Sequence, residues 1–133
     1  MKKTYFIVSI CLTLLFAVSS CKKDPGSGGT SSIYGKVLAK NYNSTFTVLQ
    51  EQYYAQDVDV YIIYGDDKSY SDRVRTSYDG TYEFKYLRKG IYHIYAYSKD
   101  STLQTNAMIP VIRDVEITKN QQENEASEIM IFN

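Results

Sequence analysis

The feature that most restricts the fold is an alternation of apolar and polar side chains from residue 33 onward, interrupted at short intervals by turn-forming residues. Val58, Val60 and Ile62, for example, each follow an acidic or aromatic residue. Successive side chains of a β-strand point to opposite faces, so this alternation predicts strands that each bury one face. Many short strands with frequent turns predict an all-β sandwich or barrel. The expected strands cover residues 33–38, 57–63, 70–77, 82–87, 92–97, 109–118 and 126–132.

The connections between these strands carry signals of their own. Asp79-Gly80 predicts a two-residue hairpin turn, because both central positions of a type I′ turn need a positive φ. The segments 42–55 and 99–108 are long for such a fold, and long loops are either functional or disordered. Within the first segment, residues 45–54 could also form one or two helical turns.

Four segments follow one another along the chain: Gly35-Lys36-Val37, Asp57 to Tyr61, Thr76 to Phe84 and Leu87 to Tyr92. Together they resemble the carboxypeptidase regulatory-like domains. The resemblance implies a transthyretin-like (prealbumin-like) domain over residues 33–133, which is a seven-stranded antiparallel β-sandwich. It also implies that the strands at 57–63 and 92–97 are neighbours. Tyr92 itself is expected to bury its ring and to send its hydroxyl to a backbone group, as in a tyrosine corner.

The first twenty residues have the character of a secretory leader. Lys2 and Lys3 precede an apolar run from residue 5 to about residue 18, shorter than the ~20 apolar residues of a membrane-spanning helix. Val18-Ser19-Ser20-Cys21 then resembles the lipobox of bacterial lipoproteins. The resemblance implies that residues 1–20 are a lipoprotein signal peptide and that Cys21 is acylated and anchors the chain to a membrane. An ordinary signal peptide with a chance cysteine is the alternative.

The segment after Cys21 has linker composition, Lys-Lys-Asp-Pro-Gly-Ser-Gly-Gly-Thr-Ser-Ser. Residues 21–32 are therefore predicted to be a lipidated, flexible Gly/Ser-rich tether that reaches ~35 Å when stretched. The Ser-Cys-Lys-Lys-Asp start resembles lipoproteins of the Bacteroidota, and Lys22 differs from the aspartate of an inner-membrane retention signal. These resemblances imply the outer membrane, with the domain on the cell surface or on the periplasmic side.

The charge balance excludes one class of partner. Removal of Lys2 and Lys3 leaves 13 basic and 15 acidic residues, a formal charge of −2, with no basic stripe along the sequence. Nucleic acid is therefore not an expected partner. Electrostatic attraction to an anionic membrane is not expected either.

No catalytic constellation, metal site or cofactor is predicted. His93 is the only histidine, and no serine motif points to it, so it is expected to be a solvated surface residue. The acidic residues near Asp59 lack the D-x-D-x-D-G loop of a calcium site. The chain is therefore expected not to be an enzyme.

The tyrosines are the strongest pointer to function, since thirteen of the fourteen lie after Cys21. The alternation and the implied strand order place five side chains on one outer face: Asp59, Tyr61, His93, Tyr95 and Tyr97. Tyrosine combines a large apolar ring with a polar tip, which suits a binding surface. The high β-propensity of tyrosine is the plain alternative explanation.

These observations predict a non-catalytic, lipid-anchored envelope protein that acts as an accessory binding or assembly module of an outer-membrane complex, for example in nutrient uptake. Its expected partners are the membrane, through Cys21, and a larger outer-membrane protein, through the tyrosines. The alternative is a cell-surface glycan-binding module that uses the same face or the long loops, although the chain has no tryptophan. A hydrolase subunit or an inhibitor-like protein is a third reading.

Overall fold

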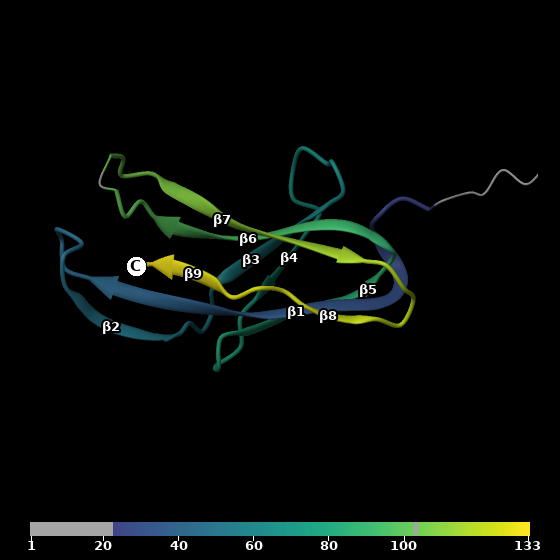
Figure 1. Cartoon of the computed structure of the whole chain (residues 1–133), viewed down its shortest axis with the longest axis horizontal. Coiled ribbons are helices and arrows are strands. Elements are labelled where there is room, and N and C mark those ends of the chain that lie inside the picture. Colours follow the sequence, from purple (N-terminus) through teal and green to yellow (C-terminus); the bar gives the residue numbers. More distant parts are fainter. Residues whose placement is uncertain (1–22, 103) are drawn as a thin grey trace, which may run out of the picture.

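The computed structural model describes residues 23–102 and 104–133, which form nine strands and no helix. The strands are β1 (Ser27–Tyr42), β2 (Leu49–Tyr54), β3 (Asp59–Tyr64), β4 (Asp72–Arg75), β5 (Thr81–Leu87), β6 (Gly90–Lys99), β7 (Met108–Ile117), β8 (Glu123–Glu125) and β9 (Ile129–Phe132). They lie in two packed layers (Figure 1), which confirms the predicted all-β sandwich. The predicted signal peptide and Cys21 lie outside the described residues. The described part has no helix that could cross a membrane.

The two sheets are built differently. One is antiparallel, with the strand order β4-β3-β6-β7. The other is centred on β1, which pairs on one edge with β5 and then β2, and on the other edge with β8 and then β9. β8 and β9 run parallel to β1, so nine strands of mixed direction replace the seven antiparallel strands of the prediction. The parallel pairs arise because the chain crosses from β7 in the first sheet to the free edge of β1 in the second.

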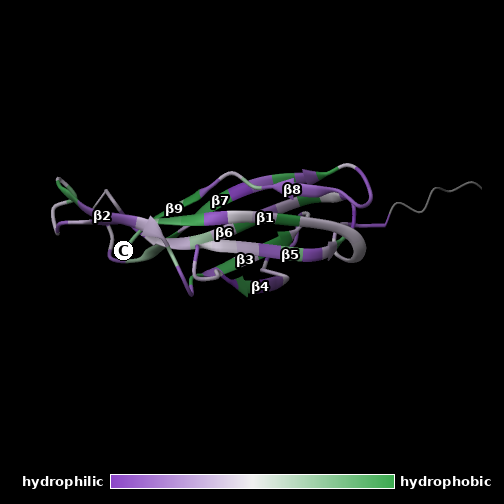
Figure 2. Ribbon diagram, turned by 90° about the horizontal axis from the view of Figure 1, so that it is seen from below, coloured by the Kyte–Doolittle hydropathy of each residue, from purple (hydrophilic) through white to green (hydrophobic). Residues whose placement is uncertain are grey.

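The core lies between the inner faces of the two sheets. Tyr92, Ile94 and Ala96 of β6 are buried, as the alternation predicts, and the ribbon in Figure 2 changes repeatedly between hydrophobic and hydrophilic along the strands. The main buried side chains are Ile33, Val37, Val60, Ile62, Tyr82, Phe84, Leu87, Tyr92, Ile94, Ile117, Ile129 and Ile131. A chain of residues 22–133 therefore contains every residue of this core.

The tether prediction is wrong for residues 27–32, which form the first part of β1. Ser31 and Ser32 are buried, and the backbone around Gly29 passes directly over the Leu87 carbonyl, where a side chain would overlap it. The register of β1 against β5 shifts at this point, since Ser27 and Ser31 both face Leu87. The glycines thus permit a bulge with a close backbone contact. A Gly/Ser-rich composition is the same for such a bulge and for a flexible linker, so the sequence alone did not separate the two.

Tyr92 ties the start of the chain to the sandwich, as its predicted role requires. Its buried hydroxyl accepts a hydrogen bond from the Gly26 amide at 2.9 Å and donates one to the Arg88 carbonyl at 2.7 Å. The Arg88 amide in turn donates to the Gly26 carbonyl at 2.8 Å. The predicted bond from the hydroxyl to the backbone is confirmed, and it joins residues 66 positions apart.

The two long segments have different structures. Residues 42–55 form a hairpin, because β2 pairs with the end of β1, so the suggestion of helical turns at 45–54 is wrong. Asn43 organises its tip, with the side-chain oxygen accepting from the amides of Thr47 and Val48. Asp100 lies at the start of the connection from β6 to β7. The Thr102 hydroxyl, and then the amides that donate to this carboxylate, hold the pKa of Asp100 below its usual value.

The turn at Gly80 also differs from its prediction. Gly80 has the expected positive φ of 77°, but Asp79 does not, and the Gly80 amide donates to the Ser77 carbonyl at 2.9 Å. The turn therefore spans residues 77–80. It links β4 and β5, which belong to different sheets, and so is not a hairpin between paired strands. The strand predicted at 70–77 is shorter, since β4 covers only Asp72–Arg75.

Candidate functional site

Four tyrosines gather on the outer face of the sheet β4-β3-β6-β7. Tyr61 of β3 lies opposite Tyr95 of β6 in the antiparallel register, and Tyr97 follows two residues later on the same face. Tyr70 comes from the loop between β3 and β4, whose return is fixed by the bond from the Ser71 amide to the Ile62 carbonyl. We call Tyr61, Tyr70, Tyr95 and Tyr97 the tyrosine cluster.

The rings of the cluster hold one another in fixed orientations. Tyr61 and Tyr95 are stacked, with centroids 5.0 Å apart and planes 15° apart. Tyr97 stands at 73° to Tyr61 and at 86° to Tyr95, with centroid distances of 5.7 and 5.5 Å. Tyr97 therefore makes T-shaped contacts with both members of the stacked pair. Tyr97 nevertheless remains 42% exposed to solvent.

Exposure divides the cluster into supporting and accessible members. Tyr95 lies on the predicted face but is only 8% exposed, so its ring supports Tyr97 and offers little contact area. Tyr70 is 54% exposed and packs edge-on against Tyr61 at 5.0 Å. It was absent from the predicted face, because a contact between a loop residue and a neighbouring strand leaves no trace in the alternation.

Charged pairs flank the cluster. Asp59 accepts from Arg75 at 3.1 Å and lies 3.5 Å from Arg73, so its carboxylate is engaged on the β3–β4 side of the face. His93 lies two residues before Tyr95 and forms a 2.5 Å contact through Nδ1 with the Asp114 carboxylate of β7. The structure therefore brings all five predicted residues to one sheet face, with Asp59 and His93 in polar pairs at its borders.

Apolar side chains extend the face along β7. The register places Ile112 opposite Tyr95 and Met108 opposite Lys99, on the same outer face, and both apolar residues are about half exposed. Sequence reasoning missed this extension, although the spacing of Met108, Pro110 and Ile112 at every second residue is a usable signal.

Nothing in the described residues adds a catalytic or metal-binding arrangement to this face. No described hydroxyl is hydrogen-bonded to His93, whose recorded partner is Asp114. Among residues 23–102 and 104–133, no three His, Cys, Asp or Glu side chains are grouped so that they could hold a metal ion. What the face offers is an aromatic surface bordered by charges.

Two hollows lie at opposite ends of the sandwich. One, of about 320 Å³, is lined by residues of the β1–β2 tip and of the β6–β7 loop, among them Phe46, Asn106 and Asn133. The other, of about 900 Å³, lies at the end where the chain enters, beside Lys23, Arg88 and Lys89. Figure 1 shows the hairpin tip, the β6–β7 loop and the C-terminus at the end remote from that entry.

The burial of two tyrosines, Tyr95 on the outer sheet face and Tyr82 in the core, limits the stability of the domain at alkaline pH. Burial, and then the nearby tyrosine hydroxyls, raise the pKa of Tyr95 to about 12. Burial also raises the pKa of Tyr82 to about 12, and its hydroxyl has no hydrogen-bond partner among the described residues. Unfolded tyrosine titrates near 10, so between pH 10 and about 12 the folded state retains protons that the unfolded state releases.

We therefore expect stability to be full below pH 10 and to fall as the pH rises toward 12. Urea midpoints measured from pH 8 to pH 12 check this. Tyr82→Phe should flatten the decline, whereas Tyr78→Phe, at an exposed turn position, should leave it unchanged. A wild-type midpoint that stays constant across this range would contradict the burial of both hydroxyls.

Comparison with known proteins adds little to the site. No family model matches the chain, and no curated protein matches it. One similar solved structure is a Pseudomonas aeruginosa protein described as a "putative carbohydrate binding protein". It has 11% sequence identity and a TM-score of 0.48, and the match covers 81% of this chain and 91% of that one. Similarity of this degree does not decide what the present chain binds, and membership of the carboxypeptidase regulatory-like family stays a prediction.

Proposed function

We propose that this chain is a non-catalytic, lipid-anchored binding module of the bacterial outer membrane and that the tyrosine cluster is its ligand-binding surface. The observation that carries the proposal is the packing of Tyr97, whose ring contacts two stacked tyrosines and remains 42% exposed. A platform that is fixed before binding loses little entropy when a ligand docks on it. The anchoring part of the proposal is supported by the lipobox-like sequence at Cys21.

A saccharide is the ligand class that suits this surface. A sugar ring has an apolar face that packs on an aromatic ring, and hydroxyls at its rim that need polar partners. The Tyr97 platform lies on the sheet face that also carries Asp59, Arg73 and Arg75, which offer charge-assisted hydrogen bonds. The same sheet face thus offers an aromatic ring for the apolar side of a sugar and charged groups for its hydroxyls.

A larger outer-membrane protein is the second candidate, and the apolar extension along β7 favours it. Tyrosine, methionine and arginine are enriched in protein interfaces, and this face carries all three types. Met108 and Ile112 would contribute to such an interface and are not needed for stacking a single sugar ring.

The saccharide proposal is tested by affinity electrophoresis of residues 22–133 in gels that contain a soluble α-glucan, β-glucan, mannan or xylan. We expect retardation by at least one of them and a loss of at least tenfold in affinity in Tyr97→Ala, because the exposed aromatic ring is removed. Tyr78→Ala is the matched control, since it removes an 83% exposed tyrosine outside this face.

Retardation that survives in Tyr97→Ala would reject the tyrosine cluster as the saccharide site. Absence of retardation in every gel, together with stoichiometric recovery of one membrane protein from detergent extracts, would support the second candidate. In that case Met108→Ser/Ile112→Ser should abolish the recovery. The same pair is expected to leave saccharide retardation unchanged.

A further inference from the structure

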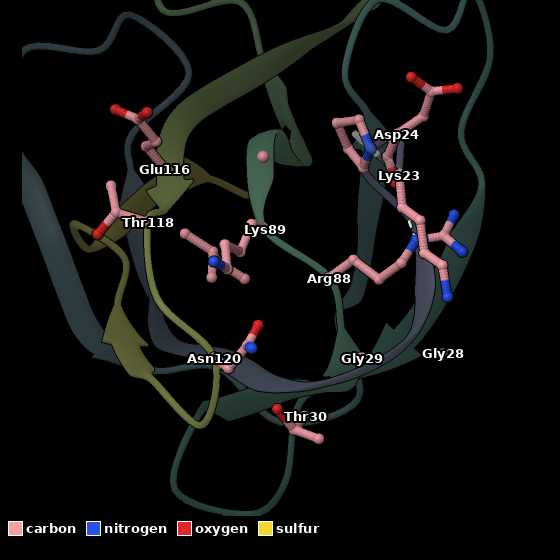
Figure 3. A pocket seen from close by; sticks show the side chains of 13 residues that line it. Lys23, Asp24, Gly28, Gly29, Thr30, Arg88, Lys89, Glu116, Thr118 and Asn120 are labelled. Carbon is pink, nitrogen blue, oxygen red and sulfur yellow. Dashed lines mark hydrogen bonds between the residues drawn. The ribbon is translucent and has the colours of Figure 1, made fainter. Parts of the chain in front are cut away.

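The hollow at the entry end of the chain is formed by segments distant in sequence. Its walls come from the residues before β1, the bulge at Gly28 and Gly29, the β5–β6 connection, the end of β7 and the turn after it. Figure 3 shows Lys89 near the middle of the opening, Arg88 and Lys23 on one wall, and Asn120 across from them. The opening of about 900 Å³ has room for a small polar headgroup.

Lys89 is the cation that occupies the middle of the opening, whereas Figure 3 shows the charged ends of Lys23 and Arg88 turned away from it. None of Lys23, Arg88 and Lys89 forms an ion pair within the described part of the chain, whose recorded salt bridges all lie elsewhere. Arg88 is held in place by its Nε, which donates to the Asp24 carbonyl at 2.9 Å. Two carboxylates also line the hollow, those of Asp24 and Glu116, and Figure 3 shows them at the rim, pointing away from Lys89.

The position of the hollow relative to Cys21 is fixed by chain length. Lys23 lines the hollow and is two residues from Cys21, and two residues span at most about 7 Å. Each headgroup layer of a bilayer is about 5–8 Å thick. An acylated Cys21 would therefore hold the opening at the depth of the lipid phosphates. The flexible tether of the sequence prediction, up to ~35 Å long, would instead have left this distance variable.

We propose that this hollow binds the phosphate of an anionic lipid headgroup in the membrane that anchors the chain. The inference rests on the anchoring part of the proposed function and is independent of the tyrosine cluster. It also replaces the expectation, drawn from the net charge of −2, that the domain has no electrostatic attraction to membranes. A net charge does not show that the fold gathers three cations at the end nearest the anchor.

The test uses residues 22–133, which contain the whole core and lack the acylated cysteine. We expect co-sedimentation with vesicles of phosphatidylglycerol and phosphatidylcholine at low salt, and little with phosphatidylcholine alone. A cation near an anionic surface strengthens binding about fivefold, so Lys23→Gln/Lys89→Gln should weaken it at least tenfold. Asp24→Asn/Glu116→Gln should strengthen it.

The matched control is Lys40→Gln/Lys68→Gln, which removes the same charge from residues outside the hollow. Equal loss in the control and in Lys23→Gln/Lys89→Gln would overturn the proposal, because it would show an effect of net charge alone. Equal binding to both kinds of vesicle would also overturn it. Saturation of the Lys89 amide shift by inorganic phosphate, without vesicle binding, would assign the hollow to a soluble anion. The mass of the mature protein reports acylation of Cys21 separately.

Discussion

Gly29→Ala is expected to destabilise the domain by about 3 kcal/mol or more, the largest effect of any single methyl group we can name in this chain. A Cβ at this position would overlap the Leu87 carbonyl group and lie 2.5 Å from the Arg88 backbone nitrogen. Both obstacles are backbone atoms of the β5–β6 connection, so no side-chain rotation can relieve the overlap. Urea unfolding of residues 22–133 measures the loss.

Gly28→Ala is the neighbouring control. Its Cβ would meet nothing within 4 Å, and its φ of 90° adds strain of about 1–2 kcal/mol. The difference between the two variants isolates the close backbone contact. If residues 27–32 were a free tether, as their composition suggests, both substitutions would leave the unfolding free energy unchanged, and that result would contradict the strand.

Tyr92→Phe is expected to cost about 2–3 kcal/mol, which is large for the removal of one oxygen atom. The hydroxyl serves a donor and an acceptor at once, the Gly26 amide and the Arg88 carbonyl, and both bonds are wholly or partly buried. Phenylalanine fills the same space, so packing is preserved and the cost comes from two polar groups left without partners. Equilibrium unfolding gives the free energy. Hydrogen exchange at the Gly26 amide gives a local readout, because its protection should disappear.

Tyr64→Phe is the matched substitution. Tyr64 packs edge-on against Tyr92 at 5.7 Å, and its hydroxyl has no hydrogen-bond partner among the described residues. We expect a change below about 0.5 kcal/mol there, as is usual for a substitution that breaks no buried contact. Equal effects at positions 64 and 92 would refute the tie between Tyr92 and the start of the chain.

Part of the candidate site could be predicted because it depends on short-range geometry. The alternation placed Tyr61, Tyr95 and Tyr97 on outward positions, and the structure confirms that β3 and β6 are neighbours with Tyr61 opposite Tyr95. The degree of exposure could not be predicted in the same way. Tyr95 points outward yet is buried, because Tyr61 and Tyr97 cover it.

The place of Tyr70 in the cluster and the ordered structure of residues 26–32 were both missed, for the same reason. Each is held by a partner that the local sequence pattern does not predict. Tyr70 contacts Tyr61 because its loop returns to β3, and Gly26 is bonded to the Tyr92 hydroxyl, 66 residues away. Amino-acid composition indicates the conformational flexibility of an isolated segment. It overestimated the flexibility of residues 27–32, because the bulge over Leu87 requires glycine for a different reason, the close backbone contact.

The sequence by itself determined the β character of the chain, the inward and outward positions on its strands, the role of the Tyr92 hydroxyl and the need for glycine at position 80. These features depend on side-chain period and on φ, which are properties of a residue and its near neighbours. The tertiary structure alone decided which strands flank β1, that β8 and β9 run parallel to β1, and that residues 27–32 are part of β1. It also brought Lys23, Arg88 and Lys89 to one opening. Such groupings depend on backbone pairing between distant segments, and a one-dimensional pattern does not encode which edges meet.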